Sequence, residues 1–197
     1  EGEIVGFSGQ AVDIDADPLT YTLDFGDGSS AVHTSAATHA YADNGVHAAT
    51  LTVSYYRFST TASIIISVTN VAPSVDAGPD ASRFTGQPFA LSASFTDAGV
   101  NDAPWATSID WGDGTPVVQG TASAPGAING SHTYVSPGTF TITVQVTDKD
   151  GGRGSDAAVV TVPNRAPVAS PGGPYSGNEG AAITFNGAGS SDPDGTS

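Results

Sequence analysis

The sequence predicts an all-β fold made of tandem β-sandwiches, and three observations lead to this prediction. Short segments alternate apolar and polar residues with the period of two that is typical of strands, as from Thr139 to Val146. Gly, Pro, Asn and Asp residues separate these segments, as expected of turns. One landmark tract also occurs twice, which indicates a repeat. No substantial helix is expected.

The landmark tract is Asp-Phe-Gly-Asp-Gly at residues 24–28, and it recurs with Trp in place of Phe at residues 110–114. Each copy is followed by His-x-Tyr, beginning at His39 and at His132. A Gly-containing turn and an alternating Thr/Val strand come next in both copies. A tandem array makes a single catalytic centre improbable.

Offsets between the copies define the units. Gly26 recurs as Gly112, 86 residues later, and His39 recurs as His132, 93 residues later, which places an insertion of 7 residues around 115–130. Ala72-Pro73 recurs as Ala166-Pro167. We therefore expect a first unit at 1–71 that lacks its opening strand, a complete second unit at 72–164, and the first two strands of a third unit at 165–197.

The remaining strands follow from the same alternation, and both units have a length that suits a modest core. Apolar residues alternate in each candidate strand. These strands lie at 49–53, 64–68, 89–95, 139–146 and 159–162.

The composition excludes several classes of function. The net charge is -15, with 5 basic and 20 acidic residues, so binding to nucleic acid or to an anionic membrane is disfavoured. Cysteine is absent, which removes disulfides and cysteine chemistry from consideration. Of the 20 acidic residues 17 are Asp, most of them beside turn residues, and Asp suits both turns and hard-cation ligation.

The ordered combination of the Asp-Phe/Trp-Gly-Asp-Gly tract, His-x-Tyr, Pro-Gly-x-Phe and Thr-Val-x-Val-x-Asp resembles the polycystic kidney disease (PKD) domain family. The resemblance covers almost the whole chain. It implies tandem immunoglobulin-like β-sandwiches of the PKD type, found in extracellular and cell-surface proteins as spacers or as adhesion and binding modules.

The landmark residues have structural explanations. Phe25 and Trp111 are expected in the cores, and Tyr41 and Tyr134 as corner tyrosines with a hydrogen-bonded hydroxyl. Asp24-Phe25-Gly26 has the letters of a kinase magnesium motif, but no nucleotide loop or catalytic-loop pattern accompanies it. No spacing of His residues indicates zinc, and no nucleophile elbow is present. The chain is expected not to be an enzyme.

Calcium is the cofactor that the acidic turns suggest. In an immunoglobulin-like sandwich the N-terminal linker, the B-C loop and the F-G loop meet at one pole, so acidic residues from all three can lie close together. Calcium takes 6 to 8 oxygen ligands, which Asp- and Asn-rich turns provide. Some bacterial members of the family bind calcium near such a junction. For the second unit the candidate ligands are Asn70, Asp97, Asp148 and Asp150, with Asp102 as a further candidate. The alternative is that these residues form solvent-exposed Asx turns.

The other two units have weaker sets of ligands. The third unit offers Asn164, Asp192 and Asp194, but its F-G loop is not in the sequence. The first unit has Asp13, Asp15 and Asp17, yet its F-G region, residues 55–59, carries no acid. The aromatic residues there, Tyr55, Tyr56 and Phe58, could pack locally, contact a neighbouring domain or bind a sugar.

The phase of the repeats suggests a mode of assembly. An open sheet edge is a template for strand pairing, so the segment 166–177 of one chain could supply the opening strand of the next chain's first unit. Head-to-tail contacts of this kind would propagate a filament. The alternative is that both ends were cut from a longer polypeptide, as the start at Glu1 rather than Met also suggests.

Three function classes remain open. The first is a non-catalytic extracellular structural repeat protein that forms a surface array or filament through copies of itself or neighbouring repeats. The second is an adhesion module for glycans or surface proteins, and the third is an accessory segment of a larger secreted hydrolase. Asn129-Gly130-Ser131 matches an N-glycosylation sequon in an expected exposed loop. Membrane insertion is not expected, because no apolar run is long enough.

Overall fold

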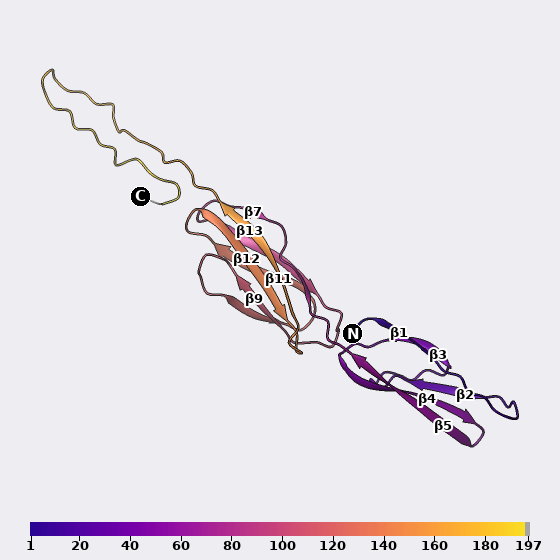
Figure 1. The fold of residues 1–197 in the computed structure, drawn as a ribbon. Helices are drawn as coiled ribbons and strands as arrows, with labels where there is room; N and C mark the ends of the chain where they lie inside the picture. Colours follow the sequence, from indigo (N-terminus) through magenta and orange to yellow (C-terminus); the bar gives the residue numbers. More distant parts are fainter. Residues whose placement is uncertain (196–197) are drawn as a thin grey trace.

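The fold is all-β, as the alternation predicts, and Figure 1 shows two β-sandwiches placed end to end with an extended C-terminal segment beyond the second. The computed structural model describes residues 1–195, and none of these residues lies in a helix. Consequently this part of the chain has no helix that could span a membrane. All five strands expected from alternation lie within strands of the structure.

The first sandwich has two small sheets. The strand β1 (Ile4–Ser8) pairs antiparallel with β3 (Ala36–Ala40) in one sheet. The other sheet has the order β2-β4-β5. Its strands are β2 (Thr20–Asp24), β4 (Gly45–Tyr55) and β5 (Phe58–Val68). The core between the sheets is formed by Phe7, Leu23, Phe25, Tyr41 and Ala49.

The second sandwich is larger, with a five-stranded sheet of order β10-β9-β12-β13-β7 and a three-stranded sheet of order β11-β8-β6. Alternate residues of β8 are buried, so one face of the strand fills the core. The strands are β6 (Ser74–Asp76), β7 (Ala81–Ser82), β8 (Pro88–Thr96), β9 (Trp105–Asp110), β10 (Val118–Ala122), β11 (Gly126–Thr133), β12 (Gly138–Thr147) and β13 (Arg153–Val162).

The opening segment of the second sandwich crosses between its two sheets. β6 pairs with β8, and β7 pairs in parallel with β13. Between them, Ala77 is only 1% exposed and packs in the core. Gly78 has a φ of 79°, and a Cβ at this position would lie 2.7 Å from the Ser92 carbonyl oxygen, so the crossing requires glycine.

The landmark tract forms the same turn in both sandwiches and anchors a histidine. Asp27 Oδ2 lies 2.6 Å from His39 Nε2, and Asp113 Oδ2 lies 2.7 Å from His132 Nε2. His39 stacks on Phe25 with ring centroids 4.0 Å apart. The recurrence of Asp and His at these positions therefore reflects a structural contact within the turn.

The corner tyrosines are confirmed. Tyr41 and Tyr134 are each 1% exposed, and their hydroxyls donate to the carbonyl oxygens of Phe25 and Trp111, each at 3.0 Å. Phe25 and Trp111 are each 3% exposed, as expected of core residues. These tyrosines tie the chain that enters β4 and β12 to the landmark turn.

The segment after β13 differs from the sequence expectation of two strands. Residues 165–195 form no strand. The one β-bridge described among them is the isolated antiparallel bridge between Val168 and Ser191. Phe185 packs edge-on against Tyr175 with ring centroids 4.9 Å apart, but it remains 74% exposed, so no closed core covers it. Residues 196–197, which fall within the expected third unit, lie outside the described residues.

Candidate metal centre

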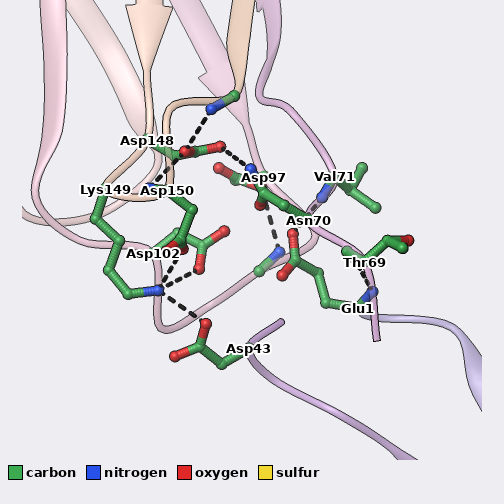
Figure 2. A network of polar contacts seen from close by, with 12 residues as sticks. Glu1, Asp43, Thr69, Asn70, Val71, Asp97, Asp102, Asp148, Lys149 and Asp150 are labelled. Atoms are coloured by element: carbon green, nitrogen blue, oxygen red, sulfur yellow. Dashed lines mark hydrogen bonds and ion pairs between the residues drawn. The ribbon is translucent and has the colours of Figure 1, made fainter. Parts of the chain in front are cut away.

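The candidate site lies where the two sandwiches meet, and five pieces of chain converge there (Figure 2). From the second sandwich come the linker at Asn70, the loop before β9 with Asp97 and Asp102, and the β12–β13 turn with Asp148 to Asp150. From the first sandwich come Glu1 and the turn at Asp43 before β4. These pieces are far apart in sequence. The fold of the second sandwich gathers the first three at one pole, and the end-to-end arrangement adds Glu1 and Asp43.

The β12–β13 turn is built around Asp148, which is 5% exposed. Its Oδ1 accepts hydrogen bonds from the backbone N-H groups of Asp150 and Gly152 at 2.9 and 2.8 Å. Its Oδ2 accepts from Asn70 Nδ2 at 3.0 Å. A Cβ on Gly152 would lie 2.4 Å from Asp148 Oδ2, so this glycine permits the close approach of the linker. Asp148 thus holds the linker against the turn.

Lys149 joins the two sandwiches through its ammonium group. Its Nζ donates to Asp150 Oδ2 at 2.6 Å, to Asp43 Oδ1 at 2.8 Å and to Asp102 Oδ1 at 3.0 Å. Burial would lower the pKa of Lys149, but these three hydrogen bonds outweigh it and raise the pKa, so the ammonium stays charged.

A second cluster of acids shares Asp102 with the contacts of Lys149. One carboxylate oxygen each of Glu1, Asp97 and Asp102 lies within 4.8 Å of the others. Asp97 has partners, since Oδ2 accepts from Trp105 Nε1 at 2.6 Å and Oδ1 accepts from the Gly99 N-H at 3.2 Å. Glu1 Oε1 accepts from the Val71 N-H at 2.6 Å.

Among residues 1–195, three buried side-chain oxygens at this junction have no hydrogen-bond partner. They are Glu1 Oε2, Asn70 Oδ1 and Asp102 Oδ2. Asp102 is 0% exposed, and an unpartnered buried carboxylate oxygen is costly. Burial raises the pKa of Asp102, and Lys149 counters only part of that effect. Burial likewise raises the pKa of Glu1, and the charge of Asp102 adds to the shift.

These residues fit a hard divalent cation. Calcium binds carboxylate and amide oxygens, and the unpartnered atoms of Glu1, Asn70 and Asp102 are of these kinds. A cation among them would supply partners for all three and would favour the ionised carboxylates. The donor set contains no thiol or imidazole that would favour zinc.

The candidate ligands of the third unit have different surroundings. Asp194 is 4% exposed, and its carboxylate accepts from the backbone N-H of Arg165 and, at 2.9 Å, from Arg165 Nε. Asp192 Oδ1 accepts from the Asp194 N-H at 2.8 Å, which closes an Asx turn. In the segment after β13, an arginine therefore neutralises the candidate acid. No contact joins Asn164 to this pair among the described hydrogen bonds.

At the free pole of the first sandwich, which is the end away from the second sandwich, Asp13 Oδ1 accepts a hydrogen bond from the N-H of Asp15 at 2.9 Å, as in an Asx turn. Tyr56 is 87% exposed and Phe58 is 77% exposed at the β4–β5 turn of the same pole. Asn129 is exposed as expected, but it lies in the strand β11 opposite Ser92 and not in a loop, because the insertion in the second unit is used to form β10 and to extend β11.

Sequence reasoning named Asn70, Asp97, Asp148 and Asp150, and the structure places all four at this junction with Asp102. The sequence did not indicate Glu1, Asp43 or Lys149 as members of the site. Asp43 and Lys149 come from turns on opposite sides of the junction, so no spacing within one unit pairs them. The offset of the repeats gives the order of the sandwiches, but the contacts across their ends depend on how one is rotated on the other.

Two β-sandwiches in tandem, each with the landmark turn and a corner tyrosine, define a modular repeat protein. The family model described as the PKD domain matches residues 1–68 and 70–162, so this chain belongs to the PKD domain family, whose fold is an immunoglobulin-like β-sandwich. Among solved structures, the chain is similar to the PKD domain of an M14-like peptidase from a Thermoplasmatales archaeon. The identity is 24%, the match covers 47% of this chain and 93% of that one, and the TM-score is 0.38. No curated protein matches the sequence.

Proposed function

We propose that this chain is a non-catalytic, extracellular structural module in which calcium fixes one PKD domain to the next. The observation that carries the proposal is Asp102, whose fully buried side chain has an unpartnered Oδ2 and lies in one group with the carboxylates of Glu1 and Asp97. A module of this kind holds whatever lies before and after it at a set distance and direction.

The ion would be held by oxygens of Glu1, Asn70, Asp97 and Asp102, with Asp148 holding Asn70 in position. Bound calcium supplies positive charge and multiple coordination, which link segments that hydrogen bonds alone hold weakly. Glu1 belongs to the first sandwich and Asp102 to the second, so the shared ligands restrict the rotation of one sandwich on the other.

Several contacts already span the junction and define the arrangement that an ion would reinforce. The Asn101 N-H donates to the Ala42 carbonyl oxygen at 3.3 Å, and beside it the Glu1 amino group donates to the Thr69 carbonyl oxygen of the linker at 3.0 Å. Lys149 bridges to Asp43. Interfaces of this polar kind normally permit domain motion unless something further restrains them.

The setting and partners follow from the same features. PKD domains are typical of secreted and surface proteins, where calcium is abundant. Repetition of the same end-to-end contact would extend the module into a surface array or filament, with copies of the chain or neighbouring repeats as partners. The net charge of -15 opposes binding to nucleic acid and to anionic membranes.

A thermal melt of the chain in millimolar calcium and in chelator tests the proposal. Because an ion that binds only the folded state stabilises it, the melting temperature of the second sandwich is expected to rise by several degrees in calcium. Asp102→Asn should abolish that rise. The matched control is Asp15→Asn, an exposed acid at the opposite pole, which should keep it. Equal melting with calcium and with chelator in the unaltered chain would reject the calcium site.

A second candidate function, sugar or protein binding, rests on the exposed Tyr56 and Phe58 at the free pole. Exposed aromatic rings stack on the apolar faces of ligands. Saturable binding to a glycan array that is lost in Tyr56→Ser and retained in Asp102→Asn would favour this function for that pole, whereas an array without signal would exclude it for the glycans tested.

A further inference from the structure

The second sandwich has an edge strand, β10, that is reduced to a single bridge in the first. Leu23 and Ile109 each stand immediately before the landmark tract. In the first sandwich Leu23 and Val32 form an isolated bridge. In the second, Ile109 and Val118 begin the full pairing of β9 with β10. The first sandwich packs its sheets without such a strand, so β10 adds surface more than core.

The exposure of β10 agrees with this interpretation. Its residues from Val118 to Thr121 are all exposed. Ala122 is the partly buried exception and packs against the core. The strand therefore presents most of its length to solvent, although it belongs to the five-stranded sheet.

The outer edge of β10 is open for pairing. Among residues 1–195, β9 is the one strand paired with β10, which ends the five-stranded sheet. This edge lies in the middle of the sequence, in a unit that has its opening strands β6 and β7 and its last strand β13. It is therefore not a gap that a missing strand of the same unit would fill.

The side chains of β10 do not protect this edge. Edge strands of soluble β-proteins commonly carry charged residues or Pro, which block the addition of a further strand. β10 has neither. No Asp, Glu, Lys or Arg occurs from Thr115 to Thr147, the part of the sequence that forms β10, β11 and β12. In a chain with a net charge of -15, two copies can approach at such a region with less repulsion than at the acidic turns.

The register of β10 indicates which of its peptide groups point away from β9. In an antiparallel pair, residues that exchange both hydrogen bonds with the neighbouring strand alternate with residues whose N-H and C=O point outward. Leu23 and Val32 exchange hydrogen bonds of 2.8 and 2.9 Å, so Ile109 and Val118, in the same register, are the exchanging kind of pair. The N-H and C=O of residues 119 and 121 therefore point outward.

The sequence of β10 is suited to pair with itself. The strand reads Val118, Gln119, Gly120, Thr121 and Ala122, which is apolar and polar on each side of the central Gly. In an antiparallel contact with a two-fold axis at Gly120, Gln119 of one copy lies opposite Thr121 of the other, and Val118 lies opposite Ala122. Each Gln119–Thr121 pair then exchanges both of its outward hydrogen bonds, and no like charges meet.

We propose that β10 of one copy pairs antiparallel with β10 of a second copy, so that two five-stranded sheets join side by side. The contact is isologous and therefore closes as a dimer. Main-chain hydrogen bonds supply the affinity, as in other cases of strand addition at an open edge. This inference goes beyond the calcium-linked module and uses none of its ligands. It is tested in chelator, so that failure of the dimer and failure of the calcium site are distinguishable.

Sedimentation equilibrium of the 197-residue chain in chelator tests the pairing. Because a strand of 5 residues gives a small interface, we expect a monomer–dimer equilibrium with a dissociation constant on the order of 0.1–1 mM. Thr121→Pro removes an outward N-H and should raise this constant by roughly tenfold or more. Thr121→Val keeps the N-H and is the matched control, which should dimerise like the unaltered chain.

A charge exchange identifies the partner and the register without a Pro substitution. The double variant Gln119→Lys/Thr121→Lys should be monomeric, and so should Gln119→Glu/Thr121→Glu, because each places like charges opposite one another. A mixture of the two variants should form mixed dimers, since every Lys then lies opposite a Glu. Thr139→Lys/Thr141→Lys, at exposed positions of β12 inside the sheet, is the control for added charge and should still dimerise.

Three outcomes overturn the inference. The first is an unaltered chain that stays monomeric up to about 1 mM. The second is a dimer that the double Lys variant leaves intact, since the contact would then lie elsewhere. The third is a mixture of the Lys and Glu variants that does not associate, because β10 would then not be opposite β10 in the proposed register.

Discussion

The two sandwiches share their landmark turns, corner tyrosines and strand order, yet only the second encloses its core. Ala158 in β13 is 1% exposed, whereas its counterpart Ile64 in β5 is 56% exposed. From Ile64 to Val68 and from Ala158 to Val162 the pattern of apolar residues is the same. The difference is the opening segment with β6 and β7, which covers one strand and not the other. Burial of an alternating strand thus depends on its neighbours as much as on its sequence.

The largest expected effect is a difference in the free energy of unfolding between an acidic substitution at Ala158 and one at Ile64. Ala158→Asp places an unpaired charge in a closed core and should destabilise the second sandwich by about 3 kcal/mol or more. Ile64→Asp lies at an exposed position and should change the stability of the first sandwich by less than about 1 kcal/mol. Both tryptophans lie in the second sandwich, so their fluorescence follows that unit alone in urea. Hydrogen exchange of β4 amides follows the first. Equal losses in the two units would contradict the comparison.

A smaller effect concerns the Asp-His contact of the landmark turn, which both sandwiches share. Burial would raise the pKa of Asp27, but hydrogen bonds from Ser29 and His39 lower it to about 2. Since the unfolded pKa is about 4, the resulting stabilisation is complete above pH ~4 and disappears as the pH falls through about 2. Asp27→Asn should cost on the order of 1 kcal/mol at neutral pH and reduce the acid sensitivity of the first sandwich.

The equivalent change Asp113→Asn serves as the matched comparison for the second sandwich, because the pKa of Asp113 is also lowered, against the effect of burial, by bonds from Thr115 and His132. The free energy of unfolding, measured from pH 6 to pH 2, checks both variants. If neither variant changes the acid limb of the curve, these Asp-His contacts do not stabilise the turns.

The smallest effect concerns the junction. Lys149→Met removes the cation that Asp43, Asp102 and Asp150 share. The acids then repel one another without calcium and attract it more strongly when it is present, so the melting shift caused by calcium should increase by a few degrees. Lys149→Arg keeps the charge and should behave like the unaltered chain. A smaller shift in Lys149→Met would show that Lys149 supports the site instead of competing with it.

Much of the fold was predictable because the signals are local. Alternation at residues 139–146 marks β12, and the Asp-Gly turns place Phe25 and Trp111 in the cores. The four candidate ligands of the second unit were predictable once the family resemblance placed their loops at one pole. Glu1, Asp43 and Lys149 were not, because their roles arise only across the junction. The strands expected at 165–197 require partner strands that residues 165–195 do not supply.

If calcium fixes the two sandwiches relative to each other, the distribution of distances between them should depend on calcium, and measuring this distribution is the most direct test of the proposed site. Spin labels at Ser63→Cys in the first sandwich and Thr121→Cys in the second can be placed without interference, because the chain has no cysteine. We predict a narrow distribution in calcium that broadens in chelator, and no such change in the Asp102→Asn variant. Distributions of the same width with calcium and with chelator in the otherwise unaltered chain would contradict the claim.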